Sequence, residues 1–449
     1  MAALAVAVGL VLADSSIVVL ALPEIYRQFE TSITGVSWVL ISFNLTLALA
    51  AVPAAAWARR FGPGRVAALG LAVFAGASLA CGLSDDLTSL ITARAVQGLG
   101  GAATVTAALE LLTTSLGSDR RAIPVWVGAG AIGAALGPAI GGLLTEFVSW
   151  QSIFLIQVPI CLLAGAPLLA AVRDESREWT RPLSLPGTER PHLAANLALA
   201  LASAGIAATL FLVVILLIEG WQLTPIAAAL VVTTVPLSTL VGARLGRRVA
   251  DARVRAATGA ILLSGGLAGL GLLPKALVVL TVPPQILAGL GLALVLSALT
   301  ETALAGRGGG ALHAGWTISS RHLGVVVGLL LLTPIFTASL ENERESAIDS
   351  GTAILLDSEL SSAAKLDLAQ RLPAELERSG DRQIPRIGEA FEPLPDDPEE
   401  RALLTQLRTD LTDQLERAAT HAFAPSFLLA ALVVLLSLIP IGLARRLEL

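Results

Sequence analysis

The sequence is poor in charged residues, and this scarcity already limits the class of protein. Only 14% of its 449 residues are Asp, Glu, Lys or Arg, whereas soluble globular domains carry roughly 25%. Its two cysteines, Cys81 and Cys161, lie in apolar stretches without a C-x-x-C or histidine-rich motif nearby, so neither a disulfide framework nor a zinc site is indicated. With one tyrosine and 4% aromatic residues, an aromatic cage for quaternary ammonium ions is poorly supported.

Short motifs of several enzyme classes are also missing. The sequence has no Walker loop, no Rossmann glycine fingerprint, no nucleophile elbow and no H-E-x-x-H metal motif. The glycine-rich stretch at 306–310 lacks the Lys-Ser/Thr ending of a phosphate cradle, and we interpret it as a hinge between two helices. We therefore expect a protein that is not an enzyme, needs no cofactor and binds neither metal nor nucleic acid.

Long hydrophobic runs dominate the chain. Hydrophobic residues make up 55% of the sequence, its mean hydropathy is +0.76, and windows of about 20 apolar residues, enough to cross a hydrocarbon core of roughly 30 Å, recur throughout. The first window lacks a basic n-region and a cleavage site, so it predicts a helix and not a signal peptide. An all-α integral membrane fold follows, with about twelve helices near residues 3–22, 36–58, 64–82, 88–115, 122–145, 151–172, 194–218, 225–246, 255–273, 276–302, 311–337 and 420–444.

Basic residues gather in alternate loops. These loops contain Arg59, Arg60, Arg65, Arg120, Arg121, Arg244, Arg247, Arg248, Arg445 and Arg446. By the positive-inside rule this side faces the cytoplasm, which predicts a multi-pass plasma-membrane protein with both termini inside. The richness in Ala, Arg and Leu and the scarcity of Lys suggest a bacterial source.

Two polar segments divide the apolar runs. Residues 173–193 contain three prolines and balanced charge, and we interpret them as a cytoplasmic linker between six-helix halves at 1–172 and 194–449. Residues 338–418 contain 19 acidic and 9 basic side chains, which predicts an acidic extracellular insert in the second half. Within it Leu404, Leu407, Leu411 and Leu415 repeat at helical spacing. A solvated spacer that binds no ligand is an alternative reading of this insert.

The fifth expected helix is rich in small residues. Gly133, Gly137, Gly141 and Gly142 allow a neighbouring helix to approach closely, and Pro138 permits a kink. The stretch therefore predicts a packing and hinge element. Such patterns alone are weak indicators, because any membrane helix can use them for ordinary packing.

The Gly-Pro-Ala-Ile-Gly-Gly run at 137–142 resembles the helix 5 antiporter motif of the major facilitator superfamily. Five further stretches, in the right order, resemble signatures of its drug:proton antiporter group, usually built with fourteen helices: 12–23, 38–45, 94–102, 150–159 and 320–328. This resemblance implies a major facilitator fold, here apparently with twelve helices, and a proton-coupled exporter of small organic molecules or drugs.

The loop between helices 2 and 3 departs from that family's pattern. The family sequence is Gly-x-Leu-x-Asp-Arg-x-Gly, whereas this chain has Ala55 for the first glycine and Arg59 for the acidic residue. The resemblance implies a cytoplasmic gate loop formed by Arg59, Arg60, Gly62 and Arg65. Because the charge at Arg59 is reversed, the usual latch between the halves must use other contacts or be weaker.

Ionisable residues inside the expected helices are candidates for function, since each costs roughly 2.5–3.5 kcal/mol to insert. Asp14 and Arg94 lie at similar depth in helices 1 and 4, where they could pair. The resemblance implies that both take part in proton coupling, with protonation of Asp14 releasing Arg94. The alternative is a static buried ion pair that only fixes helix packing.

Further polar residues could act in coupling or in substrate binding. His322 is a second candidate for proton coupling, because an unperturbed histidine titrates near neutrality; alternatively it only bonds a neighbouring helix. Arg321 cannot be discharged and must find a carboxylate, phosphate or water, so we expect it in the substrate cavity, where an anionic group would suit it. Asn44, Gln97 and Gln157 are candidates to line that cavity or to bond backbone carbonyls.

The sequence thus predicts a secondary active transporter that exports small molecules in exchange for protons by alternating access. Its expected partners are a small-molecule substrate, protons and membrane lipid, and we expect a monomer. The alternative function is a transporter-like sensor or scaffold that no longer transports and acts through the insert at 338–418.

Overall fold

The computed structural model describes residues 1–449 except 176–190, 275, 305–309, 379–386, 393–396 and 444–449. The regular elements of this described part are all helices, and twelve helical segments in it are long and apolar enough to cross a membrane. The predicted all-α membrane fold is therefore confirmed. The elements are α1 (Ala2–Val19), α2 (Leu22–Gln28), α3 (Ile33–Phe61), α4 (Pro63–Gly82), α5 (Leu87–Leu116), α6 (Asp119–Phe147), α7 (Ser152–Leu155), α8 (Gln157–Glu175), α9 (Leu193–Ile215), η1 (Leu216–Gly220), α10 (Pro225–Val232), α11 (Thr234–Gly246), α12 (Ala252–Gly271), α13 (Val278–Leu304), α14 (Gly310–Asp357), α15 (Ser362–Arg378), η2 (Gly388–Phe391), α16 (Pro398–Leu436) and α17 (Leu438–Leu443).

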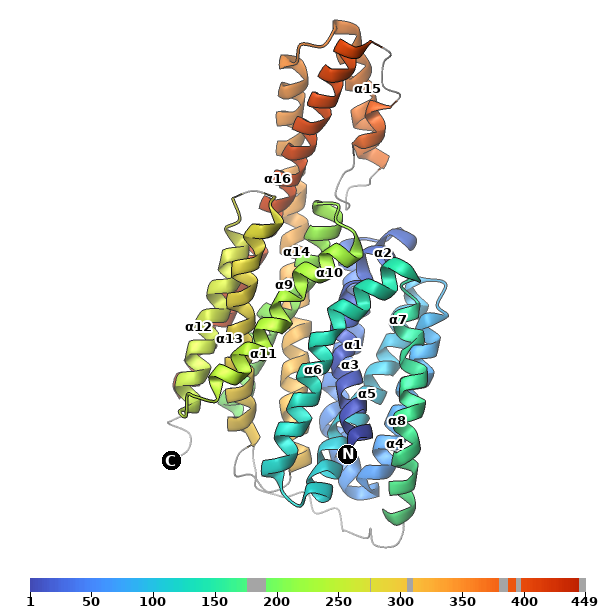
Figure 1. The fold of residues 1–449 in the computed structure, drawn as a ribbon, viewed down its shortest axis with the longest axis vertical. Coiled ribbons are helices and arrows are strands. Elements are labelled where there is room, and N and C mark those ends of the chain that lie inside the picture. Colours follow the sequence, from blue (N-terminus) through green and yellow to red (C-terminus); the bar gives the residue numbers. More distant parts are fainter. Residues whose placement is uncertain (176–190, 275, 305–309, 379–386, 393–396, 444–449) are drawn as a thin grey trace.

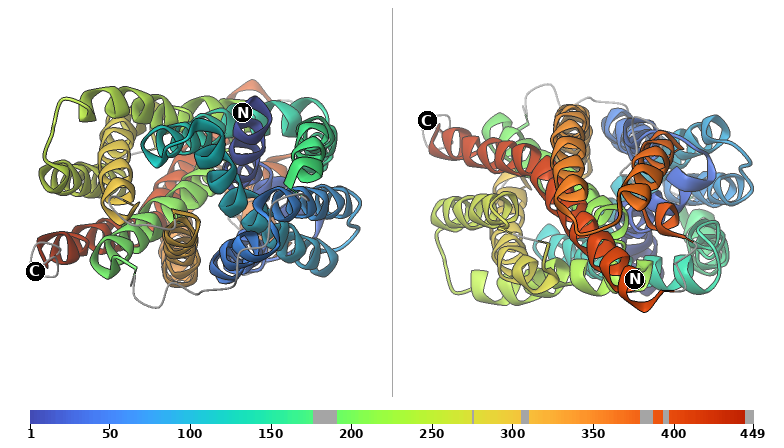
Figure 2. Two further views of the ribbon diagram at one scale, coloured as in Figure 1. Left: turned by 90° about the horizontal axis from the view of Figure 1, so that it is seen from below. Right: turned by 90° about the horizontal axis from the view of Figure 1, so that it is seen from above.

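Helices α1–α8 and α9–α17 form two bundles that lie side by side (Figures 1 and 2). We call them the N-terminal and C-terminal bundles. The end from which α14 and α16 project is the insert end, and the opposite end is the linker end. Most of the expected linker, residues 176–190, lies outside the described residues, so the domain division at 173–193 stays a prediction.

The two bundles repeat one helix contact in the same register. In the N-terminal bundle, a Cβ added to Gly133 of α6 would lie 2.1 Å from the carbonyl oxygen of Gly9 in α1. In the C-terminal bundle, a Cβ added to Gly324 of α14 would lie 2.1 Å from the carbonyl oxygen of Ala200 in α9. Both pairs are 124 positions apart (133 − 9 = 324 − 200). Glycine is required here because any side chain would collide with the facing backbone.

A second contact extends this repeat to other helices. A Cβ at Gly100 of α5 would lie 2.7 Å from the carbonyl oxygen of Gly70, and one at Gly291 of α13 would lie 2.6 Å from that of Gly259. A shift of 191 positions relates the members from α1, α5 and α6 to those from α9, α13 and α14 (200 − 9 = 291 − 100 = 324 − 133). These close helix contacts therefore recur in both bundles, and the assignment of the bundles as two transporter halves stays a prediction.

Polar contacts join the bundles at two levels. Toward the linker end, α14 packs along α3, where the Ser319 hydroxyl donates a 2.5 Å hydrogen bond to the Ala48 carbonyl. At the insert end, the backbone N–H of Ile226 donates to the Glu146 carboxylate, so an acidic side chain of α6 lies at the positive N-terminus of α10. Arg27 and Glu219 also approach to 3.4 Å there.

The expected ends of two spans are wrong. Helix α14 continues to Asp357 instead of ending near 337, and α16 begins at Pro398 instead of near 420 (Figure 1). The sequence change at these points marks where apolar residues end, but a helix satisfies its own backbone hydrogen bonds and needs no apolar side chains to continue. The Asp397 side chain, which accepts from the Glu400 N–H, caps the true start of α16.

The projecting parts of α14 and α16 form the insert together with α15 and η2, and α15 lies on the side of the N-terminal bundle (Figures 1 and 2). The insert has a hydrophobic core of its own, which buries three of the four leucines of the 404–415 repeat. Its buried members are Leu355, Leu360, Leu368, Ile387, Ala390, Phe391, Leu404, Leu407 and Leu411. Because α14 and α16 are continuous, the insert is joined to the C-terminal bundle by two unbroken helices.

Candidate functional site

Four helices of the N-terminal bundle meet at Asp14. Arg94 of α5 donates from Nη1 to Asp14 Oδ2 at 2.5 Å, and both side chains are 0% exposed. The ion pair that the sequence made possible is therefore present. Its burial in an apolar bundle matters, because an isolated charge there would be strongly destabilising.

The second carboxylate oxygen is held by two amides. Gln157 of α8 donates to Asp14 Oδ1 at 2.9 Å, and Gln97 of α5 donates to the same atom at 3.3 Å. Gln97 also donates to Ser78 of α4 at 2.8 Å and to Gln157 Oε1 at 2.9 Å, while its own Oε1 accepts from Arg94 at 2.6 Å. We name Asp14, Arg94, Gln97, Gln157 and Ser78 the charge network.

Arg94 has further partners that fix its position. Its Nε donates to the Val39 carbonyl at 3.0 Å, and its guanidinium lies 4.2 Å from the centre of the Phe43 ring and 5.6 Å from that of Phe154. Such cation–π contacts stabilise a desolvated guanidinium. Its Nη2, however, is buried without a hydrogen-bond partner in the described structure.

The charge balance of the network depends on the protonation of Asp14. With Asp14 ionised, each of its oxygens accepts from a donor and the charge is balanced by Arg94. A proton on Asp14 would remove that balance and leave Arg94 as an uncompensated buried cation, favouring a rearrangement that hydrates it or finds it another partner. Sequence reasoning placed Gln97 and Gln157 in the substrate cavity as one alternative; the structure places them against Asp14, and their role in a cavity stays a prediction.

Sequence reasoning missed Ser78 and the aromatic partners of Arg94. The single hydroxyl proton of Ser78 has two acceptors within reach, the Phe74 carbonyl of its own helix at 2.7 Å and Gln157 Oε1 at 3.0 Å. A single serine among apolar residues gives no sign of which helix it faces. Its position seven residues after Leu71, on the buried side of α4, would have been the available signal.

Asn44 and His322 join the two bundles in the interior. His322 Nδ1 of α14 lies 2.6 Å from Asn44 Oδ1 of α3, and both side chains are largely buried. The Asn44 Nδ2 donates to the Leu40 carbonyl at 2.8 Å, which leaves its oxygen to accept. This pattern assigns the proton of a neutral His322 to Nδ1. His322 thus bonds a neighbouring helix, and its predicted part in proton coupling stays a prediction.

Arg321 lies beside His322 but has a different surrounding. Its side chain is partly buried, and no described carboxylate forms an ion pair with it. At 100° per residue it lies nearly opposite the exposed face of α14, which carries Trp316, Leu323 and Val327. The Arg321 side chain therefore leaves α14 on the side of the helix that is turned away from its exposed face.

The small residues of α6 face two different neighbours. Added Cβ atoms on Gly133, Gly137 and Gly141 would collide with α1, whereas one on Gly142 would lie 2.3 Å from the Ala229 side chain in α10. This helix therefore contacts the charge-bearing α1 and the opposite bundle at once. Pro138 lies inside α6, between these contacts. Whether the helix bends there during a cycle stays a prediction.

The expected gate loop is a tight turn between α3 and α4. Gly62 has a φ of 96°, a conformation that glycine adopts without strain, and its N–H bonds the Ala58 carbonyl. Arg60 and Arg65 are exposed, and the Arg60 guanidinium lies 5.2 Å from the centre of the Phe61 ring. Arg59 is half-buried at the end of α3. Their function as a gate stays a prediction.

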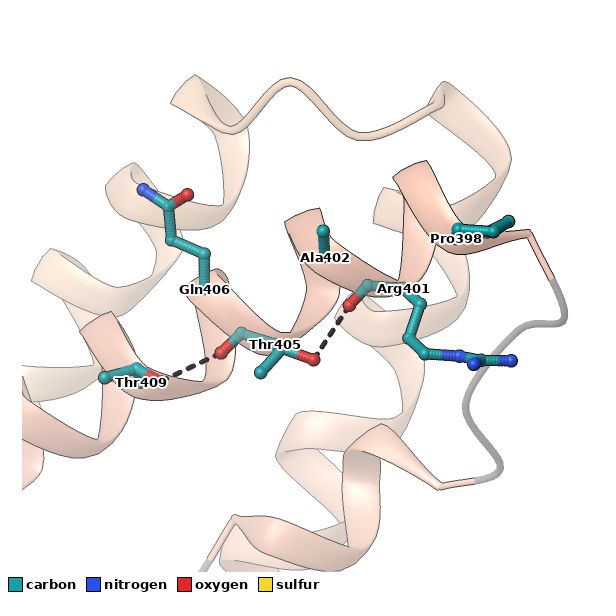
Figure 3. A pocket seen from close by; sticks show the side chains of 6 residues that line it. All are labelled: Pro398, Arg401, Ala402, Thr405, Gln406 and Thr409. Carbon is teal, nitrogen blue, oxygen red and sulfur yellow. Dashed lines mark hydrogen bonds between the residues drawn. The ribbon is translucent and has the colours of Figure 1, made fainter.

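Two hollows lie away from the charge network, on the insert. The shallow one follows one face of α16 past Arg401, Thr405 and Thr409 (Figure 3). The threonine hydroxyls there already donate to backbone carbonyls of the same helix at 2.8 and 2.9 Å, so they offer a ligand no free donor. The second, about 230 Å³, lies at the base of the insert between Gln222, Gly388, Arg408 and Glu416.

Comparisons with known proteins agree with this architecture. The family model "Major Facilitator Superfamily" matches residues 4–335. The chain is 36% identical over 177 residues to the Multidrug resistance protein Stp of Mycobacterium tuberculosis, covering 39% of this chain and 33% of Stp. It is 37% identical over 179 residues to the Tetracenomycin C resistance and export protein of Streptomyces glaucescens, covering 38% and 33%. The matches thus span about a third of the length of these curated relatives.

Solved structures show the same fold at low sequence identity. A bacterial homologue of the human lysosomal transporter Spinster, in an inward-facing and occupied conformation, matches with a TM-score of 0.59 and 16% identity, covering 99% of this chain and 96% of that one. The xylose transporter XylE of E. coli matches with a TM-score of 0.58 and 11% identity, covering 73% and 89%. The fold, the spans and the family match agree: this chain belongs to the major facilitator superfamily.

Proposed function

We propose that this chain is a proton-coupled exporter of small organic molecules that works by alternating access. The observation that carries the proposal is the buried Asp14–Arg94 pair, whose charge balance a single proton would change. The similarity to efflux and resistance proteins supports export as the direction. The charge network would be the proton site, and the space between the bundles would hold the substrate.

The bundle contacts suggest how a proton would change the conformation. Protonated Asp14 would release Arg94, and the N-terminal bundle would then move relative to the C-terminal bundle. Helix α6 is suited to transmit this motion, because it contacts α1 through Gly133 and α10 through Gly142. The Asn44–His322 bond and the Ser319–Ala48 bond are between-bundle contacts that would break and re-form.

We place the linker end in the cytoplasm and the insert outside, as the distribution of arginines favours. In a plasma membrane, protons would then enter the protein from its insert end, and substrate would leave at the same end. The membrane potential contributes about 2.3 kcal/mol for each charge moved across 100 mV. A bound cofactor would not be needed for this cycle, and a monomer would suffice.

The test uses purified protein in proteoliposomes with a pH-sensitive dye inside. Lipophilic cations, anions and neutral antibiotics are added singly, and proton movement is recorded for the wild type and Asp14→Asn. We expect at least one compound to drive proton movement in the wild type and none to do so in Asp14→Asn. Unchanged coupling in Asp14→Asn would assign Asp14 a structural role and refute the mechanism.

The pocket at the base of the insert favours a second candidate function, in which the insert binds a ligand or partner as a sensor or scaffold. This pocket lies between η1 of the C-terminal bundle and the segments of the insert that contain Gly388 and Glu416. Deletion of residues 345–415 separates the two candidates. Transport that survives with loss of a bound partner would make the insert a binding module, whereas loss of transport at normal expression would tie it to the cycle.

A further inference from the structure

Helix α14 of the C-terminal bundle carries a partly buried cation, Arg321, that lacks a carboxylate partner such as the one Arg94 has among the described residues. Arg321 lies about 140° around α14 from the mean direction of Trp316, Leu323 and Val327, which form the exposed face. The helix contacts α3 through His322 on one side and α9 through Gly324 on the other. Arg321 therefore projects from the part of α14 that faces neither lipid nor the α3 seam.

Three other described arginines near the bundles form ion pairs with carboxylates. Arg94 pairs with Asp14, Arg255 with Glu301, and Arg27 with Glu24 and Glu219. For Arg321 the described residues supply no such carboxylate and no hydrogen-bond acceptor; the neighbouring His322 is engaged by Asn44. Residues on the same side of α14, Ala314 and Ile318, are apolar and buried.

A guanidinium in this setting is satisfied either by water or by an anion that the described residues do not supply. Guanidinium cannot be discharged, has five donors and carries no acceptor. Its planar fork matches a carboxylate in a bidentate manner. We propose that Arg321 binds the carboxylate of an organic-acid substrate that lies in the space between the bundles. This inference rests on the proposed export function and names the substrate class.

The substrate charge has a consequence for the transport cycle. If one proton enters for each monoanion that leaves, two charges move inward in every turnover. A neutral substrate would move one, and a monocation none. Membrane potential should therefore accelerate export of a carboxylate more strongly than export of its uncharged amide.

The test is an equilibrium binding measurement on the full chain in lipid nanodiscs, without any gradient. The probes are pyrenebutyrate and the uncharged pyrenebutyramide, which share the hydrophobic part. We expect the carboxylate to bind more tightly to the wild type, and Arg321→Gln to weaken its binding about tenfold or more while leaving the amide unchanged. Arg321→Lys keeps the positive charge but loses the bidentate fork, so it should retain only part of the preference. Arg371→Gln, on the surface of the insert, should behave as the wild type. The binding of pyrenebutyramide also detects misfolding, since a misfolded variant would bind neither probe.

Several outcomes would overturn the inference. Equal binding of the two probes to the wild type, or an Arg321→Gln variant with unchanged preference, would exclude a carboxylate site at Arg321. Competition by phosphatidylglycerol, measured in nanodiscs with and without that lipid, would assign the site to a lipid phosphate instead. If neither probe binds but another compound drives Asp14-dependent proton flux, the substrate class is wrong and the exporter stands. If the carboxylate binds through Arg321 and no compound drives proton flux, the site stands and the exporter is wrong.

Discussion

The two bundles share a backbone design but differ in the charges they enclose. The 191-residue shift that relates Gly9, Gly100 and Gly133 to Ala200, Gly291 and Gly324 brings Asp14 to Gly205 and Arg94 to Gln285. Conversely, Arg321 corresponds to Gly130. Close helix packing is thus repeated, whereas the buried ion pair belongs to the N-terminal bundle and the unpaired cation to the C-terminal bundle. The comparison suggests that one bundle handles the proton and the other the substrate.

The largest expected effect breaks the charge balance of the N-terminal bundle. Asp14→Leu should destabilise the protein by about 3–5 kcal/mol, because Arg94 remains as an unpaired buried charge. The double variant Asp14→Leu with Arg94→Leu should recover much of that loss. Thermal unfolding in detergent provides the measurement. In the C-terminal bundle Gln285→Leu should cost only about 1 kcal/mol, since Gln285 donates one bond, to Thr281.

If Gln285→Leu proves as damaging as Asp14→Leu, the bundles are not as different as their charges suggest. Failure of the double variant to recover would show that the amides of the network, and not the charge pair, dominate the stability of this site.

An intermediate effect tests what the bundles share. Gly133→Ala and Gly324→Ala should each destabilise by about 1–3 kcal/mol, because the new Cβ would lie 2.1 Å from a facing carbonyl oxygen. Gly128→Ala is the matched control in α6: nothing lies within 4 Å of its added Cβ, and it should be neutral or stabilising by about 0.5–1 kcal/mol. Chemical denaturation or thermal unfolding would compare the three. A harmless Gly324→Ala beside a damaging Gly133→Ala would contradict the shared register.

A smaller effect concerns the bond between bundles. Asn44→Leu removes the acceptor of His322 and should destabilise the observed arrangement by about 1–3 kcal/mol, since His322 Nδ1 would be buried without a partner. Ser42→Ala on the same helix is the control, because the Ser42 hydroxyl has no partner to lose. Thermal stability and the modification rate of a cysteine introduced into the α3–α14 seam would report the change. Equal behaviour of the two variants would deny this bond a role in holding the bundles.

The smallest expected effect depends on pH. Hydrogen bonds from Ser89, and from the Thr88 backbone N–H, hold the pKa of the Asp86 carboxyl below its usual range at the start of α5. A lowered folded-state pKa gives stability that is present above the unfolded pKa and is lost as pH falls through the folded pKa. Wild-type stability should therefore decrease slightly below about pH 4. Asp86→Asn retains a capping side chain and should lack this component; an identical pH profile in both would contradict the assignment.

Sequence reasoning reached the fold and the central ion pair because both leave strong local signals. Runs of apolar residues give the spans, and a carboxylate and a guanidinium at similar depth can be matched by charge. The network around Asp14 could not be read in the same way. Gln157 lies 143 positions from Asp14, and an isolated amide in an apolar helix does not indicate its partner.

Two other features were hidden for different physical reasons. What the two bundles repeat is the close approach of helix backbones. The facing carbonyl comes from Gly9 in one bundle and from Ala200 in the other, so the residue types need not match and the two halves of the sequence show no obvious similarity. The ends of α14 and α16 were misplaced because hydropathy indicates whether a helix lies in lipid or in water and does not indicate where the helix ends. The local signal that was available is the Asp397-Pro398 start of α16, a capping residue followed by proline at the first helical position.

The central proposal is that Asp14 of the N-terminal bundle is the site that couples transport to a single proton. The most direct measurement is the reversal potential of substrate flux in proteoliposomes, with a compound from the screen above and imposed pH and potential gradients. The account predicts one proton per substrate in the wild type and zero in Asp14→Asn. Two protons per substrate in the wild type, or one remaining in Asp14→Asn, would contradict it.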